Sequence, residues 1–162
     1  MIDPSRRAVI SCAASTIAVA LTGCLGDEPT GWNIDEPIPV TTATMYQGPN
    51  CSCCDVYADY LEDALTTDLD IVVPDDLRGM KHDRGIDEEL WSCHTVELDD
   101  YLVEGHVPAK IVATLLEDGP AVAGIALPGM PAGSPGMGGT KHETWTIYEI
   151  RPGDEPGVFT DL

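Results

Sequence analysis

Residues 48–63 read GPNCSCCDVYADYLED, and their three cysteines fall within four positions. Apolar side chains then recur with helical spacing from Val56 to Leu65, which predicts a helix over residues 53–65 with one buried face. The cysteines therefore stand at the amino-terminal end of a helix. Free backbone N–H groups and the helix dipole favour a thiolate at this position, and the thiolate is both the nucleophilic and the metal-binding form.

The other predicted elements alternate along the chain around this helix. Short apolar, β-branched runs bounded by Asp, Gly or Pro predict strands at residues 42–46, 69–73, 95–98, 101–104, 121–127 and 144–150. Further helices are expected at about residues 75–81 and after Pro108, with an extra turn over residues 86–90. The resulting β-α-β-α-β-β-α order predicts an α/β, thioredoxin-like domain with a C-terminal strand extension.

The chain is strongly acidic. Lys and Arg number 8 against 28 Asp and Glu, so the formal net charge is −20 at pH 7. This composition excludes binding to nucleic acid through phosphate neutralisation, which needs clustered basic residues. An acidic surface repels itself in dilute salt, whereas at about 1 M salt the Debye length falls to about 3 Å and the repulsion is screened. The composition therefore resembles that of halophilic proteins from salt-loving archaea, with an ordinary acidic protein as the alternative.

The first residues have the features of an export signal. Arg6 and Arg7 precede an apolar run over residues 8–20, which is followed by residues 21–24 (LTGC). The paired arginines indicate the twin-arginine route, and LTGC resembles the lipobox of a lipoprotein, whose cysteine is lipidated. Fewer than about 18 apolar residues occur in a row, which argues against a transmembrane helix. We expect an exported protein anchored to the outer face of the cell membrane through lipid on Cys24.

Four cysteines remain for chemistry once Cys12 leaves with the signal peptide and Cys24 carries lipid. They are Cys51, Cys53, Cys54 and Cys93. In a thioredoxin-like topology, the loop before the third strand lies against the start of the first helix, and here that loop holds Cys93 and His94. The fold is therefore expected to bring Cys93 and His94 to the three-cysteine turn.

The crowding of the thiols indicates a metal site. Soft thiolate and thioether ligands select Cu(I) over hard ions. Zinc also accepts Cys and His, but its closed sites use separated pairs of ligands, and three thiols within four residues cannot easily occupy three corners around one ion. The same thiols can bridge several Cu(I) ions. We therefore predict a Cu(I) site that holds one ion or several.

Further soft ligands accompany the cysteines. Met130 and Met137 lie in the Pro/Gly loop at residues 128–139, and His106 stands just before the predicted third helix. These three residues and His94 are candidate ligands, with a partial packing role as the alternative for each methionine. Other residues of the same types are expected elsewhere: at the surface His82 and His142, in the core Met45 and Met80, and in helix packing Tyr57 and Tyr60.

Two other functions remain open from the sequence. A thiol–disulfide oxidoreductase would use Cys51 and Cys54 as a C-x-x-C pair, although Cys53 inside the motif and Cys93 opposite it invite wrong disulfides. An acidic adhesion or scaffolding domain would use the four cysteines in two structural disulfides. The copper site is preferred because it uses all four thiols.

Several separate motifs resemble those of the CopG-type proteins, which are domain-of-unknown-function family 411. They are the runs CSCC (51–54), SCHT (92–95), EGHVPA (104–109), AVAG (121–124) and PGMPAGSPGM (128–137), in that order. The resemblance implies a thioredoxin-like fold and a cysteine-rich copper site that handles toxic copper outside the cytoplasm. Carried over, the metal site would comprise Cys51, Cys54 and Cys93, with further candidates at Cys53, His94, His106, Met130 and Met137.

The chain thus divides into four predicted segments. They are a twin-arginine and lipoprotein type signal peptide (1–23), a lipid-anchored acidic tether (24–41), a thioredoxin-like metal-binding domain (42–150) and an acidic tail (151–162). We expect an extracytoplasmic protein that sequesters or transfers Cu(I) in copper resistance or homeostasis. Its expected partners are the membrane and a protein that donates or accepts copper.

Overall fold

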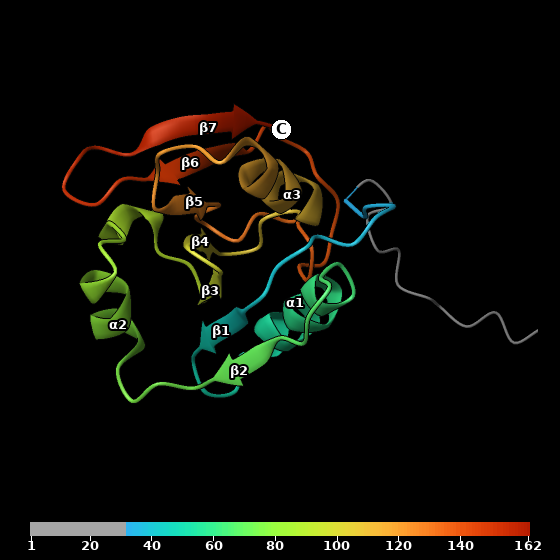
Figure 1. Ribbon diagram of the computed structural model, residues 1–162, viewed down its shortest axis with the longest axis horizontal. Helices are drawn as coiled ribbons and strands as arrows, with labels where there is room; N and C mark the ends of the chain where they lie inside the picture. The colour runs from blue at the N-terminus through green and yellow to red at the C-terminus, as the bar shows by residue number, and fades with distance from the viewer. Residues whose placement is uncertain (1–31) are drawn as a thin grey trace, which may run out of the picture.

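A computed structural model describes residues 32–162 (Figure 1). The predicted signal peptide, the predicted lipidation residue Cys24 and the first part of the predicted tether lie outside these described residues. Within residues 32–162, no helix has both the length and the apolar character needed to cross a membrane. Export and lipid anchoring therefore stay predictions.

Seven strands form one mixed sheet in the order β2-β1-β3-β4-β5-β6-β7. The strands are β1 (Ala43–Gln47), β2 (Asp70–Val72), β3 (His94–Leu98), β4 (Tyr101–Glu104), β5 (Gly124–Ala126), β6 (Thr146–Ile150) and β7 (Gly157–Asp161). β1 pairs in parallel with β2, and β4 pairs in parallel with β5. The other neighbouring strands are antiparallel.

Helices cover both faces of this sheet. Within the described residues they are α1 (Ser52–Glu62), α2 (Leu77–Asp83), the short 3-10 helix η1 (Glu88–Leu90) and α3 (Ala109–Asp118). α1 and α3 lie on one face of the sheet, and α2 and η1 lie on the other (Figure 1). The elements up to α3 follow the predicted β-α-β-α-β-β-α order, and the predicted α/β class is confirmed.

The strands bury side chains on both faces, because alternate residues of a strand point to opposite sides of a sheet. Val103 and Ile125 belong to the larger core, which includes the buried residues of α1 and α3. Their sequence neighbours Leu102 and Ala126 belong to a smaller core with Ile86, on the side of α2 and η1. The larger core therefore anchors α1, the helix that follows the three-cysteine turn.

The described part of the predicted tether, residues 32–41, contacts the domain through some of its apolar side chains, while most of its other residues are exposed. The side chains of Ile38 and Val40 are only 2% and 7% exposed. Ile38 also forms a parallel bridge with Leu65 at the end of the first α/β unit. Apolar residues spaced between the prolines bury enough surface to hold this segment in place, a contribution that composition alone does not reveal.

The predicted acidic tail, residues 151–162, includes a strand at its end, whereas residues 151–156 form an irregular and mostly exposed segment. Residues 157–161 form β7, which pairs antiparallel with β6 at the edge of the sheet. The run Val158-Phe159-Thr160 combines β-branched and aromatic residues, which favour strands, and Phe159 packs against the larger core. The neighbouring acidic residues conceal this short pattern in the sequence.

Candidate metal centre

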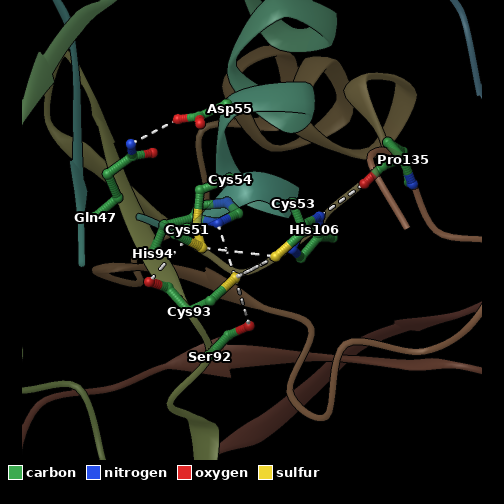
Figure 2. The surroundings of a disulfide bond; sticks show 10 residues. All are labelled: Gln47, Cys51, Cys53, Cys54, Asp55, Ser92, Cys93, His94, His106 and Pro135. Atoms are coloured by element: carbon green, nitrogen blue, oxygen red, sulfur yellow. Dashed lines mark hydrogen bonds between the residues drawn. A yellow bond between two sulfur atoms is a disulfide. The ribbon is translucent and has the colours of Figure 1, made fainter. Parts of the chain in front are cut away.

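The three crowded cysteines stand at the start of α1, as predicted. Cys51 immediately precedes the helix, and Cys53 and Cys54 lie in its first turn. Cys54 is fully buried, whereas Cys51 and Cys53 are half-buried. A disulfide joins Cys51 to Cys54, and Cys53 keeps a free thiol with its Sγ 3.6 Å from the Sγ of Cys51 (Figure 2).

Cys93 reaches this turn through the pairing of β1 with β3. β1 leads through a short turn into α1, and β3 runs antiparallel to it, with Gln47 at the end of β1 opposite His94 at the start of β3. The residue before β3 therefore lies beside the start of α1. The Sγ of Cys93 is 4.0 Å from the Sγ of Cys53, although 40 residues separate them in the sequence. The predicted convergence of these segments is observed.

Two histidines also meet the sulfur of Cys93 (Figure 2). His94 Nδ1 lies 3.2 Å from the Cys93 Sγ, and His106 Nε2 lies 3.1 Å from it. His106 follows the end of β4, which is antiparallel to β3, so the hairpin brings the two imidazoles to the same end of the sheet. The Gly105 N–H, which donates to the His94 carbonyl oxygen at 3.1 Å, extends this pairing up to His106.

A hydrogen bond fixes the tautomer of His106. Its Nδ1 lies 2.7 Å from the Pro135 carbonyl oxygen, which can only accept, so Nδ1 carries the proton. In the neutral ring, Nε2 then directs its lone pair at the Cys93 Sγ. On His94, Nδ1 faces the same sulfur, while Nε2 is buried with no hydrogen-bond partner among the described residues. Each ring thus directs one nitrogen at a single sulfur.

Burial keeps both imidazoles neutral. Loss of solvation, followed by the charges of His106 and Lys81, holds the pKa of His94 well below its usual range. Burial also lowers the pKa of His106. Because neutral imidazole is the form that binds metals, both rings can act as ligands at neutral pH without first losing a proton.

Cys93 is held as a thiol in the metal-free site. Burial, and then the neighbouring Cys53 thiol, raise the pKa of Cys93 to about 12. Cys93 lies outside α1, so it does not have the position at the helix end that favours a thiolate. A metal cation would supply the positive charge that a buried Cys93 thiolate lacks, because it binds the thiolate and displaces the proton. The site around Cys93 therefore fits a cation better than an unpaired negative charge.

The ligand atoms form two overlapping groups. One group is Cys51, Cys53, Cys54 and Cys93, the other is Cys93, His94 and His106, and the atoms of each group lie within 4.8 Å of one another. Cys93 belongs to both. Sulfur and neutral imidazole donors suit copper or zinc and are poor ligands for hard cations such as Mg²⁺ or Ca²⁺.

The loop at residues 128–139 lies against the site, but its two methionines differ in position. Pro135 contacts His106 as described above, and Gly136 approaches the backbone of α1 so closely that an added Cβ would lie 3.1 Å from the Cys53 carbonyl oxygen. Met137, the next residue, is half-buried. Met130 is 40% exposed. The roles of both methionines as ligands stay predictions.

Tyr57 is a site residue that the sequence interpretation assigned only to helix packing. Its fully buried ring lies 4.6 Å from the ring of His94 and 5.2 Å from that of His106, measured between centroids. Its hydroxyl donates to the Val107 carbonyl oxygen at 2.8 Å, and burial raises the pKa of Tyr57 well above its usual value. Tyr57 follows Cys54 by one helical turn, and this spacing is the signal that could have placed it against the site.

A buried ion pair beneath the site also escaped the sequence interpretation. Lys81 of α2 and Glu104 of β4 are 2% and 0% exposed and pair directly. Glu104 stands two residues before the candidate ligand His106, and this spacing could have placed it near the site. Lys81 carried no signal, because nothing in the sequence distinguishes it from an exposed lysine.

The other histidines and methionines of residues 32–162 differ in their exposure. His82 has an 80% exposed side chain, and His142 is also exposed, in agreement with the prediction. Met45 is fully buried in the larger core, as predicted. Met80, which the sequence placed in the core, is only half-buried.

Comparisons with known proteins point to one family. The family model described as "Protein of unknown function, DUF411" matches residues 90–137, which include Cys93, His94 and His106. Two solved structures, both described as "Copper resistance protein copG" (Form 1 and Form 2), are 31% identical to this chain. Their TM-scores are 0.66 and 0.67, and the matches cover 78% of this chain and 98% and 99% of theirs. No curated protein matches the sequence.

This chain belongs to the CopG family. The match covers almost the whole length of the two CopG structures, so the mixed α/β architecture is common to all three. The CopG-type resemblance of the sequence motifs is thereby confirmed. Family membership and the Cys/His cluster together support metal binding by this chain.

Proposed function

We propose that this protein is an extracytoplasmic copper-binding protein that sequesters or transfers Cu(I) in copper resistance or homeostasis. The observation that carries the proposal is the position of the Cys93 Sγ, which faces the Cys53 Sγ and one nitrogen each of His94 and His106. Copper is favoured because soft sulfur and imidazole donors surround one point and because the solved relatives are described as copper resistance proteins.

The state of the disulfide sets the number of donors. With Cys51 and Cys54 joined, the free thiols are Cys53 and Cys93, and the two imidazoles complete the set. Reduction adds two sulfurs within the same 4.8 Å grouping. The reduced protein is therefore expected to hold more Cu(I) than the oxidised protein, with sulfurs shared between ions where more than one is bound.

We further propose that the protein acts at the outer face of the cell membrane, anchored through lipid on Cys24. The support is the paired arginines and the LTGC run in the sequence. A copper donor or acceptor protein would meet the cluster at its half-buried side, where Cys51, Cys53 and Cys93 retain some exposure. A Cys24→Ser variant that still fractionated with membranes would contradict the lipid anchor.

The copper proposal is tested by titrating the reduced protein with Cu(I) under anaerobic conditions, in competition with bicinchoninate. Wild-type protein is expected to hold copper against this competitor, and Cys51→Ser and Cys93→Ser are each expected to lower the amount bound. Cys93→Ser should have the larger effect, because Cys93 belongs to both ligand groups. Loss of all copper from the wild type to the competitor would overturn the proposal.

One observation favours a second candidate function, a membrane-anchored thiol–disulfide oxidoreductase. It is the Cys51–Cys54 disulfide at the start of α1, with the free thiol of Cys53 3.6 Å from the Sγ of Cys51. Such an enzyme would cycle this disulfide and keep its activity without Cys93. Insulin reduction by a Cys93→Ala variant at the wild-type rate would support this function, and loss of the rate would count against it.

The structure contradicts the remaining alternative from the sequence, an acidic adhesion or scaffolding domain whose four cysteines form two structural disulfides. Within residues 32–162 there is one disulfide, and Cys53 and Cys93 are free thiols. A thiol reagent is therefore expected to label Cys53 and Cys93 before reduction, and four cysteines of the folded domain after it.

A further inference from the structure

Glu104 is a fully buried carboxylate with three donors. Its Oε1 accepts from the Lys81 ammonium and from the Ser92 backbone N–H, the latter at 2.5 Å. Its Oε2 accepts from the Thr95 hydroxyl at 2.6 Å. Neither Lys81 nor Glu104 is more than 2% exposed. Both carboxylate oxygens are therefore satisfied, and the buried charge is paired.

These contacts surround the candidate ligands. Ser92 immediately precedes Cys93, and Thr95 immediately follows His94, so one carboxylate binds the chain on both sides of the Cys93-His94 pair. The same residue lies two positions before His106 along the chain. The backbone between them is close-packed: a Cβ added at Gly105 would lie 2.8 Å from the Ser92 Oγ. Glu104 thus connects the segment that carries Cys93 and His94 to the segment that carries His106.

We propose that Glu104 is the positioning residue that holds Cys93, His94 and His106 together as one metal-binding triad, and that the positive charge of Lys81 balances the buried charge of its carboxylate. The inference rests on the proposed function of this cluster as a copper site. Glu104 has no direct contact with the Cys93 sulfur or with a histidine ring nitrogen; it acts through the backbone of Ser92 and the side chain of Thr95.

Burying an ion pair has an unfavourable desolvation free energy, so its presence beside a loop indicates a specific role. Taking two charges out of water costs several kcal/mol per ion, and apolar residues of similar volume often stabilise a fold equally well. A carboxylate offers two oxygens with about four acceptor sites, so it can accept from Ser92, Thr95 and Lys81 at once, which an apolar side chain cannot do. The ion pair therefore supplies directed hydrogen bonds at the two places that flank the ligands.

The experiment uses the whole protein in wild-type form and in three variants. Glu104→Gln removes the charge, and Lys81→Met/Thr95→Val/Glu104→Leu replaces the buried polar groups by apolar ones so that no charge is left unpaired. Arg84→Gln/Glu97→Gln is the matched control, because it removes a second ion pair, between the end of α2 and β3. The side chains of Arg84 and Glu97 are 27% and 38% exposed. Cu(I) affinity is measured against bicinchoninate, folding by circular dichroism, and imidazole ligation by X-ray absorption of the bound copper.

We expect the triple variant to fold, to bind Cu(I) about tenfold to hundredfold more weakly than wild type, and to lose imidazole scattering. Glu104→Gln keeps one oxygen that can accept from the Ser92 N–H, so its loss of affinity should be smaller, and the control should bind as wild type. A folded triple variant with wild-type affinity and imidazole scattering would overturn the positioning role and leave the copper site standing. Failure of the wild type to bind Cu(I) would instead overturn the proposed function.

Thr95→Val keeps the test decisive if both Glu104 variants fail to fold. It removes one hydroxyl and no charge, so the ion pair remains. A smaller loss of affinity with weaker imidazole scattering is the expected result. The positioning role would be contradicted by unchanged affinity and scattering. In metal-free protein, alkylation of Cys93 by iodoacetamide should also become faster in Thr95→Val, since the segment is held less firmly.

Discussion

At the scale of single residues, the site depends on His94 and His106 meeting at one sulfur. Their nitrogens lie 3.2 Å and 3.1 Å from the Cys93 Sγ. The Tyr57 ring packs against both imidazoles and limits their rotation. Each ring was identified from the sequence as a candidate ligand, but the buried position of His94, and its neutral state, follow from the packing alone.

The depressed pKa of His94 predicts how the stability of the metal-free protein varies with pH. The unfolded chain takes up a proton near the ordinary histidine pKa of 6.5, whereas burial holds the pKa of folded His94 well below it. The unfolded state therefore binds more protons as pH falls, so the free energy of unfolding should decrease below about pH 6.5. Urea unfolding at a series of pH values measures this decrease.

The same series in two variants isolates the contribution of His94. His94→Phe keeps a ring of similar size and removes the titration, so the decrease in stability with falling pH should become shallower. His82→Gln removes an 80% exposed histidine and should leave the pH dependence as in wild type. Identical profiles for His94→Phe and wild type would show that His94 is not the group responsible.

At the scale of secondary-structure elements, the loop at residues 128–139 closes the site by close backbone contact with α1. Gly136 has a left-handed backbone, with φ at +75°, and its Cα faces the Tyr57 N–H and the Cys53 carbonyl oxygen. The contact between Pro135 and His106 depends on this approach, because Pro135 is the preceding residue. Gly136 therefore allows the loop to come close enough for the Pro135 carbonyl oxygen to orient the His106 ring.

Gly136→Ala is expected to move the loop away from α1. The added Cβ would lie 2.9 Å from the Tyr57 nitrogen, and the left-handed conformation alone costs a residue with a side chain about 1–2 kcal/mol. The free energy of unfolding should fall by at least that amount, and Cu(I) affinity should fall with it. Gly138→Ala is the matched control, since nothing lies within 4 Å of its Cβ position. Equal effects of the two substitutions would refute this account of the loop.

At the scale of the whole molecule, the dominant property is a formal net charge of −20. Most of these carboxylates are exposed, and they surround two hydrophobic cores of ordinary composition. Repulsion between like charges opposes the compact state in dilute salt and is screened as the ionic strength rises. The fold should therefore be least stable in low salt, as expected for a halophilic protein.

Thermal unfolding between about 0.1 M and 1 M KCl tests this expectation at pH 7. Tm should rise with salt, by about 4 °C for each kcal/mol of repulsion removed from a domain of this size. Near the isoelectric point of about 4.1, where few net charges remain, the rise should be much smaller. An equal rise at both pH values would mean that salt acts on hydrophobic burial instead of on charge.

The sequence by itself determined the α/β class, the element order up to α3 and most of the candidate ligands, because periodicity and cysteine spacing are local properties. It did not predict the burial of Ile38 and Val40 or the strand at residues 157–161, because these short apolar patterns are hidden among prolines and acids.

Only the tertiary structure decided which residues meet. The β1–β3 and β3–β4 pairings fix Cys93, His94 and His106 beside α1, and burial sets their protonation. The supporting contacts of Tyr57 and of the Lys81–Glu104 pair also come from packing. A contact between residues far apart in the chain depends on strand register and on the exclusion of water, and neither quantity is written in any short stretch of sequence.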